Sequence, residues 1–240
     1  MAHPSAASIK VLAFDVFGTV VDLRSSVIAE GERLGKAKKL SIDWAAFADA
    51  WRAAYRPSLD RVQRGERPWT KLDDLHRSSL DKILTQFKIE GLGADEVDHF
   101  NRVWHRLKPW PDSVAGLQRL KTRLVITTLS NGNTSLLTNM AKHAGLPWDC
   151  ILCAETVRHY KPDAEIYRLV PDLFDLKPEQ VMLVAAHEND LQAAKTHGLR
   201  TAFVHRPLEH GPGKASSIPS AGQYDFVAKD FLDLADQLGI

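Results

Sequence analysis

The feature that most constrains the fold is a set of short apolar runs with almost no polar interruption. Between most of them the apolar residues follow helical spacing. Because the runs do not alternate apolar with polar residues, they predict strands that are covered on both faces. This pattern is typical of an α/β protein with a Rossmann-like parallel sheet. The runs occupy residues 9–14, 123–129, 150–154, 181–186, 200–204 and 224–228.

One long interval breaks this alternation. Residues 25–109 contain no strand pattern but several amphipathic helical stretches, one of which opens with Ser41 and Asp43. Ser and Asp are preferred at helix N-caps, so both are candidate caps. The sequence predicts a helical cap over residues 25–109, inserted into a Rossmann-like core made of residues 1–24 and 110–240.

Composition narrows the function class. The formal net charge is +1, with 44% hydrophobic and 25% charged residues, which gives no basic surplus for nucleic acid. No run approaches the ~18 apolar residues of a membrane span, and residues 1–10 lack a leader pattern. We therefore expect a soluble, cytoplasmic protein with neither nucleic acid nor membrane as a partner. The two cysteines, Cys150 and Cys153, lie in an apolar run and are expected to be core thiols.

The polar residues that carry chemistry follow the predicted strands. Asp15 comes after the first run, Ser130 and Asn131 after the second, Lys161 after the third and residues 187–190 after the fourth. Ligands of parallel sheets gather at the carboxyl ends of the strands, so these side chains are expected to meet. An acid, a hydroxyl, an amide and an ammonium group at one edge predict a site that handles an anion. Residues 207–223, rich in Gly, Pro and Ser, predict an extended surface loop.

Four segments in this order resemble the motifs of the haloacid dehalogenase superfamily: "FDVFGTVVD", "LSNG", "KPDAEIY" and "VAAHENDLQAA". The similarity covers nearly the whole chain and implies that fold with an inserted cap. It also implies that Asp15 is a nucleophile. The superfamily contains phosphatases and phosphonatases as well, so the resemblance alone does not choose the substrate.

Departures from the phosphatase pattern favour one branch. Phe17 stands where the phosphatases carry a second, proton-donating Asp, and Ala185 and Ala186 stand where a Gly-Asp pair would help to hold magnesium. Halide leaves carbon without a proton or a metal, so we expect a dehalogenase that uses no metal and no cofactor. The alternatives are a magnesium-dependent phosphatase or phosphonatase, and a non-catalytic small-anion binder. Retention of Asp15, Ser130 and Lys161 argues against the binder.

The resemblance to (S)-2-haloacid dehalogenases implies a mechanism. Asp15 attacks the carbon that bears the halogen, and water hydrolyses the resulting ester to a 2-hydroxyalkanoate. The substrate is a short 2-haloalkanoic acid, with fluoroacetate among the candidates. Lys161 keeps Asp15 ionised, and Trp51 helps to wall the site. The other residues expected at the site are Arg52 and Asn131 for the halide, and Thr19, Phe17, Ser130, Asn131 and Tyr167 around the substrate, with Thr19 also orienting the nucleophile. Tyr167 either supports the polar network or packs a helix against the sheet.

The fourth motif departs from the dehalogenase pattern too. That pattern carries Ser and Asn two residues apart, where this chain has Ala185 and His187. A neutral imidazole accepts a proton near neutral pH, so His187, oriented by Asp190, is a candidate for activating or positioning the hydrolytic water. The alternative is that His187 only hydrogen-bonds its loop. Analogy with related dehalogenases predicts a homodimer.

Overall fold

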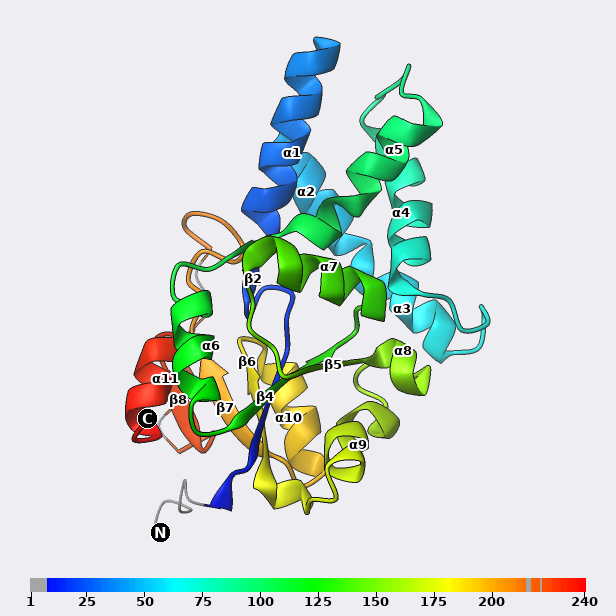
Figure 1. Cartoon of the computed structure of the whole chain (residues 1–240). Coiled ribbons are helices and arrows are strands. Elements are labelled where there is room, and N and C mark those ends of the chain that lie inside the picture. Colours follow the sequence, from blue (N-terminus) through cyan, green and yellow to red (C-terminus); the bar gives the residue numbers. More distant parts are fainter. Residues whose placement is uncertain (1–7, 215–216, 221) are drawn as a thin grey trace.

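The computed structural model describes residues 8–214, 217–220 and 222–240, and its centre is a six-stranded parallel sheet (Figure 1). The strand order is β5-β4-β1-β6-β7-β8, and every neighbouring pair is parallel. Each strand overlaps one predicted apolar run, so the predicted α/β class is confirmed. The strands are β1 Val11–Phe14, β4 Val125–Ser130, β5 Cys150–Cys153, β6 Val181–Ala185, β7 Arg200–Val204 and β8 Phe226–Ala228.

Helices cover the sheet on both sides. Helices α6 and α11 pack against one another on one side, and α9 and α10 lie on the other (Figure 1). Gly145 ends α7 in the left-handed conformation, with φ 69°, which a glycine adopts without strain. The helices of the core are α6 Ser113–Lys121, α7 Thr134–Ala144, α8 Ala154–Val157, α9 Ala164–Leu173, η3 Pro178–Gln180, α10 Glu188–Thr196 and α11 Phe231–Gln237.

A group of helices stands beyond one edge of the sheet (Figure 1). Asp43 caps one of them by accepting from the Ala46 N–H at 2.9 Å, whereas Ser41 lies outside the helix. Packed rings fill the interior, and Trp51 is wholly enclosed there, with its indole N–H donating to the His76 carbonyl at 3.3 Å. The expectation that Trp51 walls the site is therefore wrong. These helices are α1 Leu23–Lys38, α2 Trp44–Ala53, α3 Tyr55–Gln63, α4 Leu72–Gln86, α5 Ala94–Asn101 and η2 Arg102–Arg106.

A small antiparallel ribbon, which the sequence did not reveal, joins the two parts. Strand β2 (Val21–Asp22) pairs with β3 (Lys108–Pro109), so the chain leaves the core and returns to it side by side. The division into a core of 1–24 and 110–240 and a cap of 25–109 stays a prediction. Residues 1–7 of that core lie outside the described residues, and so does most of the stretch 1–10 in which no leader pattern was found. Within the described ranges no helix has the length and apolar character needed to cross a bilayer.

His76 in the interior of the cap supplies a stability prediction. It is 2% exposed, stacks on Trp104 at 3.7 Å, and has no hydrogen-bond partner for either ring nitrogen among the described residues. Burial lowers the pKa of His76 to about 3. Below pH ~6.5, His76 therefore binds a proton in the unfolded chain but not in the folded chain. The free energy of unfolding falls as the pH falls below that value. At pH 5 this costs about 2 kcal/mol.

We expect His76→Phe to flatten the acid limb of the stability curve, because Phe fills the same space and cannot be protonated. Urea unfolding at pH 8 and at pH 5 measures the effect. His143→Gln, at an exposed position of α7, is the matched control and should keep the parent's pH dependence. A His76→Phe protein that loses as much stability as the parent between these pH values contradicts the assignment.

Candidate active site

Asp15 lies directly after β1, at the carboxyl end of the central strands, and its residue is only 8% exposed. One carboxylate oxygen, Oδ2, accepts from the Thr19 hydroxyl at 2.8 Å and contacts His187 Nδ1 at 2.9 Å. The other oxygen, Oδ1, has a single long contact among the described residues, 3.5 Å to Lys161 Nζ. The two oxygens therefore differ: Oδ2 is held by two groups, and Oδ1 remains available.

Thr19 orients the Asp15 carboxylate through its hydroxyl group. It is wholly buried, and its Oγ1 accepts the Ala186 N–H at 3.0 Å. This contact leaves the hydroxyl hydrogen to point at Asp15. The expectation that Thr19 also contacts substrate is wrong, because its side chain does not reach the cavity.

Lys161 lies between two carboxylates. Its Nζ donates to Asp190 Oδ2 at 2.5 Å as well as reaching Asp15, and the Tyr167 hydroxyl donates to Asp190 Oδ1 at 2.7 Å. The Tyr167 ring also stacks on His197 at 5.3 Å, so this tyrosine both supports the polar network and packs its helix. Among the described residues the Asp190 carboxylate has no hydrogen bond or ion pair with the His187 ring, and only the Asp190 backbone N–H donates to the His187 carbonyl, at 3.2 Å. The expectation that Asp190 orients this imidazole is therefore wrong. The reason is geometric, since the first turn of α10 directs Asp190 toward Lys161.

These contacts determine the ionisation states of Asp15 and Lys161. Burial would raise the pKa of Asp15, but the charge of Lys161 and the hydrogen bonds from His187 and Thr19 hold that pKa well below its ordinary value. Burial would likewise lower the pKa of Lys161, yet the charges of Asp190 and Asp15 raise it. Asp15 is thus an ionised carboxylate beside an ammonium group at neutral pH.

His187, the N-cap residue of α10, contacts two acids. Its Nε2 lies 2.7 Å from Glu209 Oε1, opposite the contact of Nδ1 with Asp15. Burial would lower the pKa of His187, but the hydrogen bonds to Asp15 and Glu209 raise it to about 10. The imidazole is therefore charged in the resting site, and the sequence argument from a neutral ring does not hold there.

Glu209 is the residue that the sequence analysis missed. It belongs to the segment predicted as an extended surface loop, of which residues 215–216 and 221 lie outside the described part of the chain. Its side chain is nevertheless only 8% exposed. The sequence held only an indirect signal for Glu209. His187 replaces the Asn of the dehalogenase pattern, and an imidazole at that position would be expected to have an acidic partner, which none of the four motifs supplies.

A cavity of about 460 Å³ opens beside Asp15, between the sheet edge and the cap. Phe17 gives it an apolar wall, packed edge-on against Trp104 at 5.7 Å. Ser130 does not line it: the residue is wholly buried, and its Oγ accepts the Gly132 N–H at 3.4 Å. The arrangement therefore does not support the expectation that this hydroxyl binds substrate. The lining residues are Asp15, Phe17, Arg52, Ala53, Tyr55, Arg56, Asn131, Lys161, Pro162, Tyr167, His187, Asn189 and Asp190.

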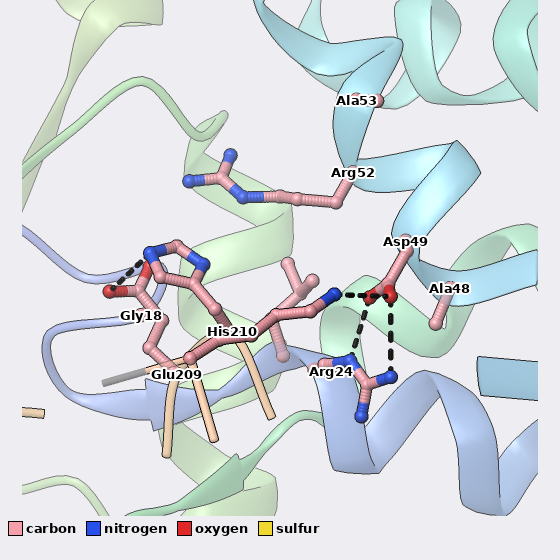
Figure 2. Close-up of a pocket in the computed structure, with 10 residues that line it drawn as sticks. Gly18, Arg24, Ala48, Asp49, Arg52, Ala53, Glu209 and His210 are labelled. Carbon is pink, nitrogen blue, oxygen red and sulfur yellow. Dashed lines mark hydrogen bonds and ion pairs between the residues drawn. The ribbon is translucent and has the colours of Figure 1, made fainter. Parts of the chain in front are cut away.

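Arg52 extends from α2 of the cap into this region. Its guanidinium lies 4.8 Å from the centre of the Tyr55 ring, and no ion pair or hydrogen bond of that group occurs within the described ranges. The Tyr55 hydroxyl accepts from Asn131 Nδ2 at 3.1 Å, and Asn131 Oδ1 accepts the Lys161 N–H at 2.8 Å. Arg52 also lines a second cavity of about 350 Å³ beside Glu209 (Figure 2). The predicted halide residues thus lie together, and the cation among them forms no ion pair within the described ranges.

A parallel α/β core with an ionised aspartate at the end of its first strand, closed by a helical cap, defines a class of hydrolases with a carboxylate nucleophile. A family model described as haloacid dehalogenase-like hydrolase matches residues 9–198. The chain belongs to this family, as the sequence resemblance predicted.

Similar proteins agree with this assignment. The haloacetate dehalogenase H-2 of Moraxella sp. (strain B) is 26% identical, over 82% of this chain and 86% of that protein. The (S)-2-haloacid dehalogenase 1 of Pseudomonas sp. (strain CBS-3) is also 26% identical, over 88% and 95%. The crystal structure of a defluorinating L-2-haloacid dehalogenase superposes with a TM-score of 0.94 at 43% identity and covers 100% of both chains. That of another L-2-haloacid dehalogenase gives 0.92 at 44% identity, over 96% and 99%.

Proposed function

We propose that the protein hydrolyses the carbon–halogen bond of short 2-haloalkanoic acids, giving 2-hydroxyalkanoic acids through an ester of Asp15. One observation carries the proposal: the cavity presents the available Oδ1 of an ionised Asp15 together with the guanidinium of Arg52, which forms no ion pair within the described residues. A nucleophile and a cation for the leaving anion are the two groups that this displacement requires. The names of the similar proteins, which act on haloacetate and (S)-2-haloacids, support the same chemistry.

In the first step, Asp15 Oδ1 bonds to the carbon that bears the halogen and the halide leaves with inversion. Arg52 and Asn131 receive the halide, and Lys161 keeps the nucleophile ionised. Phe17 excludes water from one side, so the carboxylate reaches the substrate with little competing solvation. We place the substrate carboxylate beside the turn that follows β4.

In the second step, water attacks Cγ of the ester and restores the Asp15 carboxylate. His187, together with Thr19, contacts Oδ2, the oxygen left as the ester carbonyl. We assign it to this step, in the region where the dehalogenase pattern has Ser and Asn and this chain has Ala185 and His187.

The arrangement counts against phosphate-ester hydrolysis. Phe17 has no proton to give a leaving alcohol, and the Asp190 carboxylate is occupied by Lys161 and Tyr167. Fluoroacetate turnover, cytoplasmic location and a homodimeric state stay predictions.

The test is halide release from 2-chloropropionate, chloroacetate and fluoroacetate, with p-nitrophenyl phosphate as the competing substrate and with or without EDTA. We expect chloride from the chlorinated acids at the same rate in EDTA, and no phosphate. Phosphate release that requires magnesium, with no halide from any acid, would overturn the proposal. Turnover of no substrate would favour an anion binder.

A further inference from the structure

We propose that Glu209 is a positioning residue that holds His187 as a charged hydrogen-bond donor to Asp15 Oδ2, so that His187 stabilises the oxyanion formed when the ester is hydrolysed. This inference rests on the proposed function and assigns a role to the loop after β7. It differs from general-base catalysis, because a charged imidazole cannot accept a proton from water.

The contacts of Asp15 identify the oxyanion. Because Oδ1 is the available oxygen, it bonds to the substrate carbon and Oδ2 becomes the carbonyl oxygen of the ester. Thr19 Oγ1 and His187 Nδ1 already lie 2.8 and 2.9 Å from Oδ2. Two donors fixed on the atom where negative charge develops are the arrangement of an oxyanion hole.

The hydrolytic step balances as follows. The water oxygen bonds to Cγ and negative charge moves onto Oδ2. The tetrahedral intermediate then collapses, the Cγ–Oδ1 bond breaks, and Oδ1 leaves as the hydroxyl oxygen of the product. One proton of the water ends on that hydroxyl and the other passes to solvent, and Asp15 regains an ionised carboxylate.

Glu209 is built into this site. Its Oε1 lies 2.7 Å from His187 Nε2, and the carboxylate also approaches Gly18, whose φ is 84°. A Cβ on Gly18 would lie 2.3 Å from Glu209 Oε1 and 3.2 Å from the His187 ring, so the glycine leaves the space that both side chains fill. Figure 2 shows Glu209 and His210 in the loop, facing the cap helix that carries Arg52.

The charges around His187 change during the reaction. Asp15 and Glu209 contact its ring, and two cations lie further out: Arg52 of the cap and Lys161 behind Asp15. The His210 ring lies 3.8 Å from Glu209 Oε2. Esterification removes the charge of Asp15, which leaves Glu209 as the acid that retains the imidazole proton. Neutralising Glu209 therefore affects the ester intermediate more than the resting enzyme.

The test is Glu209→Gln, which keeps the size and an acceptor oxygen but removes the charge. In a single turnover of 2-chloropropionate we expect about one equivalent of chloride at nearly the parent rate. Decay of the esterified protein, followed by intact mass after quenching, should slow roughly tenfold or more. In the parent, decay should be level near neutral pH and fall at high pH as His187 loses its proton. In the variant, this fall should move to lower pH.

A double-mutant cycle separates positioning from a merely structural effect. In a His187→Asn background, Glu209→Gln should slow ester decay no further, because its partner is gone. Leu208→Gln, the preceding residue of the loop and 58% exposed, is the control and should keep the parent's decay rate. Thermal unfolding of each variant confirms that it is folded.

Two results would overturn the inference: ester decay in Glu209→Gln at the parent rate, or parent decay that rises with pH as a base would require. In both cases chloride is still released, and the proposed function stands. Absence of halide release from the parent overturns the proposed function and this inference with it.

Discussion

Asp15→Asn lowers halide release from 2-chloropropionate by ~10⁴-fold or more, because an amide oxygen is too weak a nucleophile to displace halide from carbon. Asn has nearly the same shape, and its oxygen still accepts from Thr19, so the sheet edge keeps its structure. The low pKa of Asp15 also stabilises the fold above the unfolded value near 3.9, and this contribution is lost as the pH falls below it. The variant should therefore be somewhat less stable at pH 7.

Ion chromatography of chloride and urea unfolding measure the two effects. Asp175→Asn is the matched control, because Asp175 is exposed and does not line the cavity. Its φ of 51° is a conformation that Asn tolerates. It should keep the parent's halide release. An Asp15→Asn protein that retains more than about a hundredth of the parent's rate would exclude Asp15 as the nucleophile.

The strand pattern predicted the sheet and most of the site because its information is local. An apolar run that ends in a polar residue places that residue at the sheet edge, and this rule brings Asp15 and Asn131 together. Lys161 follows its strand only after the short helix α8, Ala154–Val157. The short ribbon of β2 and β3 escaped prediction, since two residues form no periodic pattern. Trp51 was misplaced because helical spacing shows that a ring is buried, but not against which part of the molecule.

Partners distant in sequence could not be predicted. Asp190 lies three residues from His187, yet the turn of the helix separates their side chains, and its carboxylate contacts Lys161 instead. Glu209 comes from a loop whose composition predicts only exposure, and the contact with His187 depends on the path of the whole segment after β7.

The charges of the site are matched in number and in place. The site contains three acids, which are Asp15, Asp190 and Glu209. It also contains three cations, which are Lys161, the charged His187 and Arg52. The Arg52 guanidinium forms no ion pair within the described ranges. Displacement converts the negative charge of Asp15 into that of the halide, which moves toward Arg52. The displacement therefore moves one negative charge across the cavity without creating another. Lys161 keeps the nucleophile ionised, Arg52 receives the halide, and His187 acts in the hydrolysis of the ester.

Lys161→Met is expected to be the most damaging change to this balance. Nζ lies between Asp15 and Asp190, both buried, and Met fills its volume without the charge. The two acids then face one another, the pKa of Asp15 rises, and one of them binds a proton. We expect halide release to fall ~10³-fold or more and the free energy of unfolding at pH 7 to drop by about 3–5 kcal/mol, as for other buried pairs that lose one partner.

Asp190→Asn added to Lys161→Met should recover stability without activity, because it removes the facing acid but leaves Asp15 without its cation. The residual activity of Lys161→Met should rise with pH, because Asp15 with a raised pKa ionises at a higher pH than in the parent. Lys142→Met, exposed on α7, is the control and should match the parent in both measurements. Parent-like unfolding and halide release in Lys161→Met would show that the hydrogen bonds of Asp15 to Thr19 and His187 suffice to keep it ionised.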